Sequence, residues 1–307
     1  MRKSSQDTVL QEFKVSEPGE LLSFLIEKNV RKSRNAVKSL LAHKQIRVNG
    51  KLVTQFNHEL QKGDKVSVMK FNQARKERKL KGATIVFEDE YIIVVDKDAG
   101  LLSVSTDKEK SRTVFNVLNE YVKKANKNAR VFVLHRLDRE VSGLMVFAKN
   151  PEVQSIFQSE WDKVVPVYNY TTVIEGDIIS KSGKIESWLT ENKNFVMQYS
   201  LTDNGGLKAT TYYKTVKSTP RYSLLNLELE TRRKNQARIH MKQTGHPIVG
   251  DKKYGAKSSP IKRIALHAQE MVLMHPITKE KLEFKSPTPK KMLELFNERT
   301  ITNNQIK

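Results

Sequence analysis

The sequence predicts an α+β fold built on a mainly antiparallel sheet, with a small α/β module in front of it. From residue 84 onward, predicted strands follow one another in runs, with only occasional helices between them. A doubly wound parallel fold would alternate strands and helices instead. A nearly all-polar stretch at residues 70–82 (KFNQARKERKLKG) separates the two regions. With 307 residues, 38% of them hydrophobic, the chain is long enough for two domains with cores of their own.

The charge of the chain indicates a polyanionic partner. The formal net charge is +21 and the sequence pI is about 9.8, a combination typical of proteins that bind nucleic acid. The chain has no cysteine, which excludes disulfides, cysteine zinc sites and cysteine nucleophiles. No apolar run is long enough to span a bilayer, and no apolar signal core follows the polar start. We therefore expect a cytoplasmic protein with no membrane partner.

The first region begins with residues 1–16, which we expect to be a weakly structured lead-in. Apolar residues at helical spacing predict helices over residues 20–28 and 33–43, the second with Ser33 as its N-cap. Residues 46–53 (IRVNGKLV) predict a hairpin that turns at Asn49-Gly50, and a short strand is expected at residues 65–69.

This arrangement resembles an S4 RNA-binding domain across residues 17–70. The resemblance rests on Ser33-Arg34, Ala36, Leu40 and the Val48-Asn49-Gly50 turn, although the family often has glycine where this chain has Lys44. It implies that RNA is bound by the basic residues clustered here, which are Arg31, Lys32, Arg34, Lys38 and Arg47. The alternative is a small basic helical module with no nucleic-acid role.

Residues 71–83 are expected to be a basic linker without a strand, and residues 84–290 a second domain. In that domain, strands are expected at residues 84–88, 91–96, 131–134, 144–148, 167–175, 183–189, 194–200, 209–216, 222–229, 266–273 and 282–284, and helices at 114–124, 151–161 and 233–244. Residues 291–307 are expected to form a last helix, over residues 291–298, and a tail.

One stretch of the second domain, VFVLHRLDREVSGLMVFAK at residues 131–149, places dense polar chemistry between two apolar runs. Short apolar runs bounded by turn residues indicate buried strands. Asp138 lies between Arg136 and Arg139. Nearby positive charge keeps a carboxylate ionised, as a nucleophile or a base requires. A loop that holds a structural ion pair explains the same residues equally well at this point.

Five segments, in order, resemble the RluA family of pseudouridine synthases. They are YIIVVDKDAGLLSV, HRLDREVSG, YNYTTVIEG, GHPIVGDKKYG and RIALHAQEMVLMHPITKEKLEFKSP, which lie within residues 84–289. An S4 domain ahead of such a catalytic domain is common in this family. The resemblance implies an isomerase that converts specific uridines of RNA to pseudouridine and needs no cofactor and no metal.

The resemblance also implies roles for individual residues. Asp138 matches the catalytic aspartate, Tyr170 the tyrosine that packs against the target base, and Arg238 the arginine that pairs with the aspartate. Arg136 matches a residue that helps to hold the target nucleotide out of its stack. The remaining RNA contacts expected in this domain are His135, Arg233 and Asn235.

Departures from the family pattern lie close to these positions. Asp98 stands where the family has proline, Arg232 where it has glycine, and Asn235 where histidine is common. Tyr168 stands where lysine is frequent. None of these changes removes a proposed catalytic group, so they bear on substrate contacts and specificity.

Other functions remain as alternatives. The histidines at positions 240, 246, 267 and 275 fit no standard metal-ligand spacing, and Asp138 and Glu140 lie too close in a turn to flank a glycosidic bond. A non-catalytic RNA-binding factor for ribosome assembly would not need Asp138 together with Tyr170 and Arg238. The expected RNA is large-subunit rRNA, because family members with an S4 domain commonly act there, and tRNA is the second candidate. Nothing in the sequence demands more than a monomer.

Overall fold

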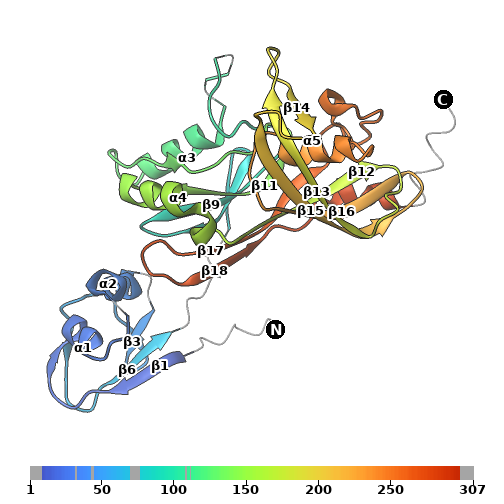
Figure 1. Ribbon diagram of the computed structural model, residues 1–307. Coiled ribbons are helices and arrows are strands. Elements are labelled where there is room, and N and C mark those ends of the chain that lie inside the picture. Colours follow the sequence, from blue (N-terminus) through green and yellow to red (C-terminus); the bar gives the residue numbers. More distant parts are fainter. Residues whose placement is uncertain are drawn as a thin grey trace. The chain divides into compact units, whose positions relative to one another are not determined.

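The computed structural model describes residues 9–31, 33–42, 45–69, 77–107, 109–110 and 112–297. The chain divides into two compact units, drawn as ribbons in Figure 1. Unit 1 contains residues 1–76 with the short segments 89–91 and 275–280, and unit 2 contains the rest. The predicted α+β class, with a mainly antiparallel sheet, is confirmed. No helix among the residues described is long and apolar enough to cross a membrane.

Unit 1 contains a four-stranded antiparallel sheet and two helices. The sheet order is β1 (Val9–Lys14), β6 (Lys65–Met69), β3 (Ile46–Val48) and β4 (Lys51–Leu52), and β2 (Gly19–Glu20) pairs with β5 (Glu59–Leu60). Helices α1 (Leu21–Glu27) and α2 (Arg34–Ala42) share one apolar core with these strands. The expectation of a weakly structured lead-in is wrong for β1, because this segment pairs with β6 and packs Phe13 against the core. Residues 1–8 lie outside the described part.

Two local signals in unit 1 are confirmed. The Ser33 hydroxyl oxygen accepts a hydrogen bond from the Ala36 N–H at 3.2 Å, which is the geometry of an N-cap at the start of α2. Asn49 and Gly50 have φ angles of 50° and 77°, the left-handed pair that a two-residue hairpin turn needs.

Unit 2 is built on one large mixed sheet. Among its described residues, the strand order is β14-β13-β15-β16-β12-β17-β11-β9-β8-β7, with β10 added beside β11 and β18 beside β17. All pairings are antiparallel except that of β11 with β17. The strands are β7 (Arg78–Leu80), β8 (Ala83–Glu88), β9 (Ile92–Lys97), β10 (Phe132–Val133), β11 (Ser142–Ala148), β12 (Val167–Glu175), β13 (Ser182–Glu191), β14 (Met197–Ser200), β15 (Leu207–Ser218), β16 (Tyr222–Leu229), β17 (Leu266–Met274) and β18 (Lys281–Lys285).

The prediction of a linker without a strand over residues 71–83 is wrong for Arg78–Leu80, which forms β7 and pairs with β8. An edge strand is held through its backbone, so its side chains can stay charged and exposed, which hides it from a search for apolar alternation. Residues 70–76, the other part of the basic stretch, lie outside the described residues.

Two helices of unit 2 begin at side-chain caps. Thr113 and Asn150 cap α3 (Val114–Lys123) and α4 (Pro151–Val164) through their side-chain oxygens. Helix α4 packs against β10, β11 and β17, whereas α5 (Gln236–Gln243) packs against β13, β14 and β15. Helix α5 begins later than predicted because Asn235 has a left-handed backbone, with φ 52°. The described chain ends with α6 (Lys290–Leu293) and a 3₁₀ turn, Glu294–Phe296, which overlap the last helix predicted at residues 291–298.

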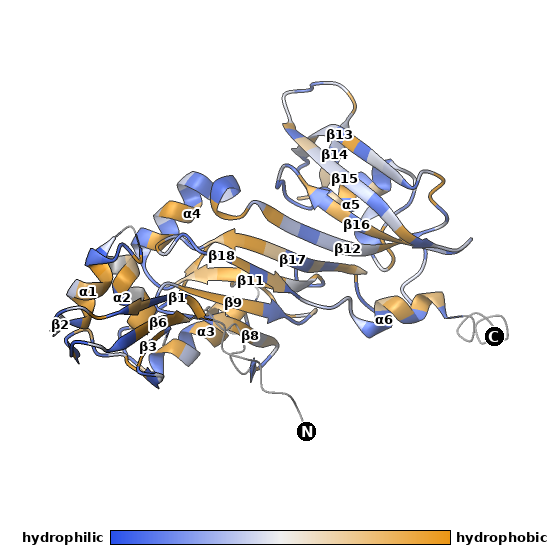
Figure 2. Cartoon of the chain, turned by 90° about the horizontal axis from the view of Figure 1, so that it is seen from below, coloured by the Kyte–Doolittle hydropathy of each residue, from blue (hydrophilic) through white to orange (hydrophobic). Residues whose placement is uncertain are grey.

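In the middle of the sheet, residues from four strands lie side by side in one row that runs across the strands. Tyr170 on β12 pairs with Ala268 on β17, Ala268 pairs with Gly143 on β11, and Gly143 pairs with Lys97 on β9. Strands β9 and β11 are largely hydrophobic (Figure 2), and every residue of β11 is buried. A Cβ atom on Gly143 would lie 2.2 Å from the Ala268 carbonyl oxygen, so this parallel pairing requires glycine. The row therefore anchors the end of the 135–143 stretch in the core.

Candidate active site

Asp138 lies on the loop between β10 and β11. Its Oδ2 accepts hydrogen bonds from Arg238 Nη1 and from Asn235 Nδ2, both at 2.7 Å. The side chain is 38% exposed, and no described residue donates a hydrogen bond to Oδ1. The carboxylate is thus fixed through one oxygen and open at the other, which suits a nucleophile.

Arg238 is held in place from the side opposite Asp138. Its Nε and Nη2 donate to the two carboxylate oxygens of Asp251, at 2.7 and 2.8 Å, and its guanidinium carbon lies 4.9 Å from the centre of the Tyr254 ring. Burial acts to lower the pKa of Arg238, but the hydrogen bonds and charge of Asp251 and the charge of Asp138 raise it above its ordinary value. The guanidinium is therefore a permanent cation that bridges two carboxylates in a fixed geometry. The structure brings the predicted pair, Asp138 and Arg238, together.

Asn235 was predicted to contact RNA, and in the structure its side chain is bound to Asp138. Its left-handed backbone at the start of α5 turns the side-chain amide onto Asp138. The Asn235 Oδ1 accepts a hydrogen bond from the Tyr254 hydroxyl at 3.1 Å, and that hydroxyl accepts one from the Met197 N–H at 3.2 Å. Because the oxygen end of the amide is engaged by a donor, the nitrogen end must face the carboxylate. Asn235 therefore orients Asp138.

Tyr170 reaches the same site from β12. A register shift between Asn169 and Tyr170 sets the ring opposite Ala268, and the residue is 9% exposed. Burial raises the pKa of Tyr170 to about 12, and the negative charge of Asp138 acts in the same direction. The hydroxyl is therefore protonated at neutral pH. It lies close enough to Asp138 for the negative charge of that carboxylate to act on its pKa.

His135 was also predicted to contact RNA, but its ring belongs to an aromatic column behind Tyr170. The rings of Trp161, His135, Tyr168 and Tyr170 follow one another with centres 5.1, 5.2 and 5.0 Å apart. The His135 Nε2 accepts the Val146 N–H at 3.0 Å, and burial lowers the pKa of His135 to about 3. The imidazole is therefore neutral, and its position supports Tyr168 and, through it, Tyr170.

Arg136 and Arg233, the other predicted RNA contacts of unit 2, are exposed. Arg136 lies two residues before Asp138, and Arg233 lies two residues before Asn235. The Arg233 Nε donates to the Lys208 carbonyl at 3.2 Å, which fixes the guanidinium while its two Nη groups remain open to a phosphate.

Sequence reasoning missed the residues that hold the Asp138 loop from inside. Lys97 is fully buried, and its Nζ donates to the carbonyls of Asp98, Leu101 and Arg139 at 2.9, 2.8 and 3.2 Å. Burial lowers the pKa of Lys97 to about 7, and the positive charge of Arg263 acts in the same direction. The Ser103 hydroxyl donates to the Leu137 carbonyl at 2.7 Å and accepts the Leu137 N–H at 3.0 Å.

One of these supporting residues, Lys97, could have been recognised from the sequence. A lysine that ends an apolar strand, as Lys97 ends IIVVDK, is an unusual candidate for burial and indicates a specific set of acceptors. Asp251 lies in the GHPIVGDKKYG segment, but nothing local shows that it binds Arg238.

The predicted RNA contacts of unit 1 lie around α2. Arg34 and Lys38 are exposed on the helix, and the Lys38 Nζ lies 5.9 Å from the centre of the exposed Phe56 ring. Arg31 and Arg47 each donate a hydrogen bond to a nearby carbonyl, of Val30 and Gly50. Lys32 lies outside the described residues. Exposed cations beside an exposed aromatic ring are the groups that bind single-stranded nucleic acid.

Comparisons with known proteins point to one family. The family model described as RNA pseudouridylate synthase matches residues 91–243. The chain is 31% identical over 281 residues to the uncharacterized RNA pseudouridine synthase YhcT of Bacillus subtilis (strain 168), covering 90% of this chain and 92% of the relative. It is 29% identical over 283 residues to the ribosomal large subunit pseudouridine synthase D of Haemophilus influenzae, covering 86% of each.

A solved structure shares the fold. Human RNA Pseudouridylate Synthase Domain Containing 4 superposes with a TM-score of 0.55 at 23% identity, over 68% of this chain and 90% of the human one. The family match includes Asp138, Tyr170, Asn235 and Arg238, and ends before Asp251. This chain belongs to the RNA pseudouridine synthases of the RluA type, and is therefore an isomerase that acts on RNA.

Proposed function

We propose that this protein isomerises specific uridines of large-subunit rRNA, with Asp138 as the reacting carboxylate. The observation that carries the proposal is the geometry of Asp138, whose Oδ2 is held by Arg238 and Asn235 while Oδ1 is open. Large-subunit rRNA is favoured because several relatives, including that of Haemophilus influenzae, are named ribosomal large subunit pseudouridine synthase D.

The isomerisation breaks the bond between uracil N1 and ribose C1′ and forms a bond between C5 and C1′. The proton on C5 is released to solvent, and N1 gains one. The Asp138 carboxylate acts as nucleophile, on the sugar or on the base, and is regenerated at the end. Arg238 orients it, and the Tyr170 ring provides a face for the detached base while the base turns.

The target uridine must leave its stack before it can reach Asp138. Flipping a nucleotide out of a helix costs a few kcal/mol. Phosphate contacts offset this cost, and the chain has a net charge of +21 to make them. We expect Arg136 to help hold the target nucleotide out of its stack, and its exposure two residues before Asp138 supports this role.

The chemical role of Asp138 is tested with Asp138→Asn, which keeps the shape of the side chain and removes its charge. We expect tritium release from RNA that carries 5-tritiated uridine to fall about a thousandfold or more, while RNA binding stays within a few-fold. Asp203→Asn, on an exposed loop of the same unit, is the matched control and should keep full activity. Normal tritium release by Asp138→Asn would refute the mechanism.

The RNA substrate is identified by chemical mapping of pseudouridines in total RNA from cells with and without the gene. Loss of one or more sites in the large-subunit rRNA supports the proposal. Loss confined to tRNA would replace the rRNA assignment and leave the mechanism intact. An unchanged map, together with inactive purified protein, would favour a binding factor instead.

A further inference from the structure

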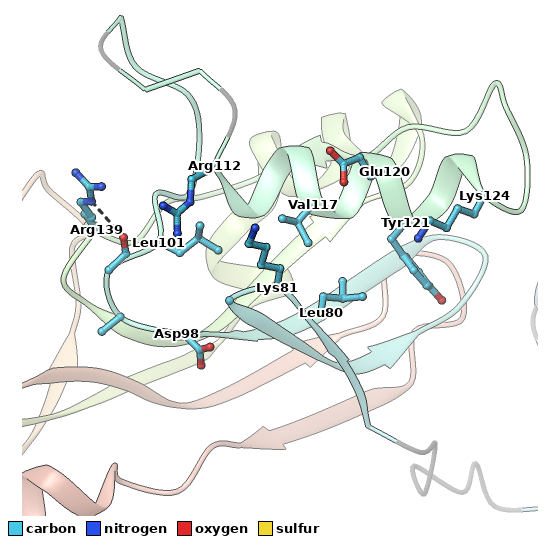
Figure 3. A pocket seen from close by; sticks show the side chains of 13 residues that line it. Leu80, Lys81, Asp98, Leu101, Arg112, Val117, Glu120, Tyr121, Lys124 and Arg139 are labelled. Carbon is cyan, nitrogen blue, oxygen red and sulfur yellow. Dashed lines mark hydrogen bonds between the residues drawn. The ribbon is translucent and has the colours of Figure 1, made fainter.

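A cavity of about 700 Å³ lies in unit 2 outside the site of Asp138 (Figure 3). It is bounded by the end of β7 and the turn after it, by the loop at residues 98–101, and by α3. Leu80, Leu101 and Val117 supply apolar lining, and Tyr121 adds an aromatic ring. We call this space the α3 cavity. Its volume falls in the range of roughly 300–1,000 Å³ that is common for small-ligand sites.

The lining of the α3 cavity is positively charged on balance. Its cations are Lys81, Arg112, Lys124 and Arg139, and its anions are Asp98 and Glu120. Figure 3 shows Lys81 and Arg112 among the side chains that line the cavity. No described carboxylate lies within salt-bridge distance of Lys81, Arg112 or Lys124. An excess of cations over anions at a concave surface favours an anionic ligand.

The wall of the α3 cavity is hydrogen-bonded to the loop that carries Asp138. The Gly100 N–H donates to the Arg139 carbonyl at 2.7 Å, and the Arg139 Nε donates to the Gly100 carbonyl at 3.1 Å. The buried Lys97 Nζ donates to the same Arg139 carbonyl. Arg139, which follows Asp138 directly, therefore belongs both to the wall of the α3 cavity and to the loop that carries Asp138.

We propose that the α3 cavity binds one unpaired nucleotide of the substrate RNA other than the target uridine. The base lies against Leu80, Leu101 and Val117, and the lining cations Lys81, Arg112 and Lys124 hold phosphates of the RNA. Unstacked bases are the parts of RNA that proteins read most readily, and an apolar floor with cationic walls suits one of them. The inference rests on the proposed function, because it requires RNA to occupy the Asp138 site.

The test compares two double variants that remove the same charge from the same two elements. Lys81→Ala/Lys124→Ala removes lining cations, whereas Lys79→Ala/Lys123→Ala removes exposed lysines that do not line the cavity. With total RNA from cells that lack the gene, we expect the KM of the first variant to rise about tenfold, with kcat within about twofold. The salt slope of log Kd should fall by about two. Identical behaviour of the two double variants would overturn the inference.

A third variant separates a nucleotide site from a surface that only attracts phosphates. Val117→Trp fills the floor of the cavity and leaves every cation in place, so we expect it to weaken RNA binding as well. Wild-type affinity in Val117→Trp would overturn the nucleotide assignment.

The failure of this inference is distinguishable from that of the proposed function. RNA binding is measured by filter retention in parallel with tritium release. If wild-type protein releases no tritium but the lining variant still binds RNA more weakly than its control, the cavity is an RNA site and the isomerase proposal fails. If wild-type protein is active and both double variants bind alike, the isomerase proposal stands and the cavity inference fails.

Discussion

Residues 9–69 of unit 1 and the active-site region of unit 2 differ in where they keep their charges, although unit 1 also buries Asp89 and His275. In the described part of residues 9–69, Gln45 and Ser67 are the buried polar residues, and every charged side chain is at least partly exposed. Unit 2 instead buries charged side chains close to its active site, among them Lys97, Arg238 and Asp251. Phosphates are bound by charges that stay in water, whereas a reacting carboxylate needs partners held in a fixed geometry. This is the difference expected between a surface that binds RNA, as proposed for unit 1, and a site that performs chemistry on it.

The largest effect expected from this comparison is that of Arg238→Met. It leaves Asp251 buried without its partner, so the free energy of unfolding of unit 2 should fall by about 3–5 kcal/mol. The kcat for tritium release should fall about a thousandfold, because Asp138 loses its cation. Urea unfolding followed by tryptophan fluorescence reports on unit 2 alone, since both tryptophans, Trp161 and Trp188, lie there.

The matched control for that experiment is Arg34→Met on α2 of unit 1. Because Arg34 is exposed, its replacement should change the stability of either unit by no more than about 0.5 kcal/mol. If Arg238→Met is as stable and as active as Arg34→Met, the buried ion network has no role in the fold or the chemistry.

A smaller effect is expected from acid on a buried histidine of α5. His240 is fully buried between Thr211 and Ser187, and burial lowers its pKa from 6.5 to about 4. Between these two pH values the unfolded chain binds a proton that the folded chain does not, so stability falls as pH falls through this window. The loss attributable to His240 should reach roughly 2–3 kcal/mol near pH 4.

The measurement compares urea unfolding of wild type and His240→Gln at neutral pH and near pH 4. Glutamine does not titrate, so the variant should lose less stability on acidification than wild type does. An equal loss in the two proteins would mean that His240 is not neutral in the folded state.

The variant Asn235→Ala tests whether Asn235 acts on Asp138 or on RNA. Loss of a hydrogen bond to a charged group is worth about 1.5–3 kcal/mol, so kcat should fall about 10- to 100-fold while KM for RNA stays unchanged. Asn235→His keeps a donor and should recover part of the lost kcat. A rise in KM with normal kcat would return Asn235 to the RNA-contact role.

The smallest effects are expected on the surface of unit 1. Arg34→Ala and Lys38→Ala should each raise the KM for RNA only a few-fold, with kcat unchanged, because each removes one exposed phosphate contact. The salt slope of log Kd should fall by about one for each change. Lys62→Ala, an exposed lysine of the same unit away from α2, is the control. A drop in kcat for either α2 variant would contradict the separation of binding from chemistry.

Much of the fold could be predicted because its signals are local. The apolar patterns at residues 65–69, 167–175 and 222–229 predict β6, β12 and β16 with their observed bounds. The caps and the Asn49-Gly50 turn depend on neighbouring residues alone, so the sequence states them directly. Family resemblance placed Asp138 with Arg238, although they are 100 residues apart.

The tertiary structure decided the rest. Edge strands β1 and β7 take their conformation from the strands they pair with, and their own polar side chains do not reveal it. Sheet register and the placement of α5 determine the positions of Asn235, His135 and Asp251. No local sequence pattern encodes these positions. The burial of Lys97 likewise depends on three carbonyls that only the folded loops bring together. The sequence determines which chemical group each residue carries. The packing of segments that are distant along the chain determines which partner that group contacts.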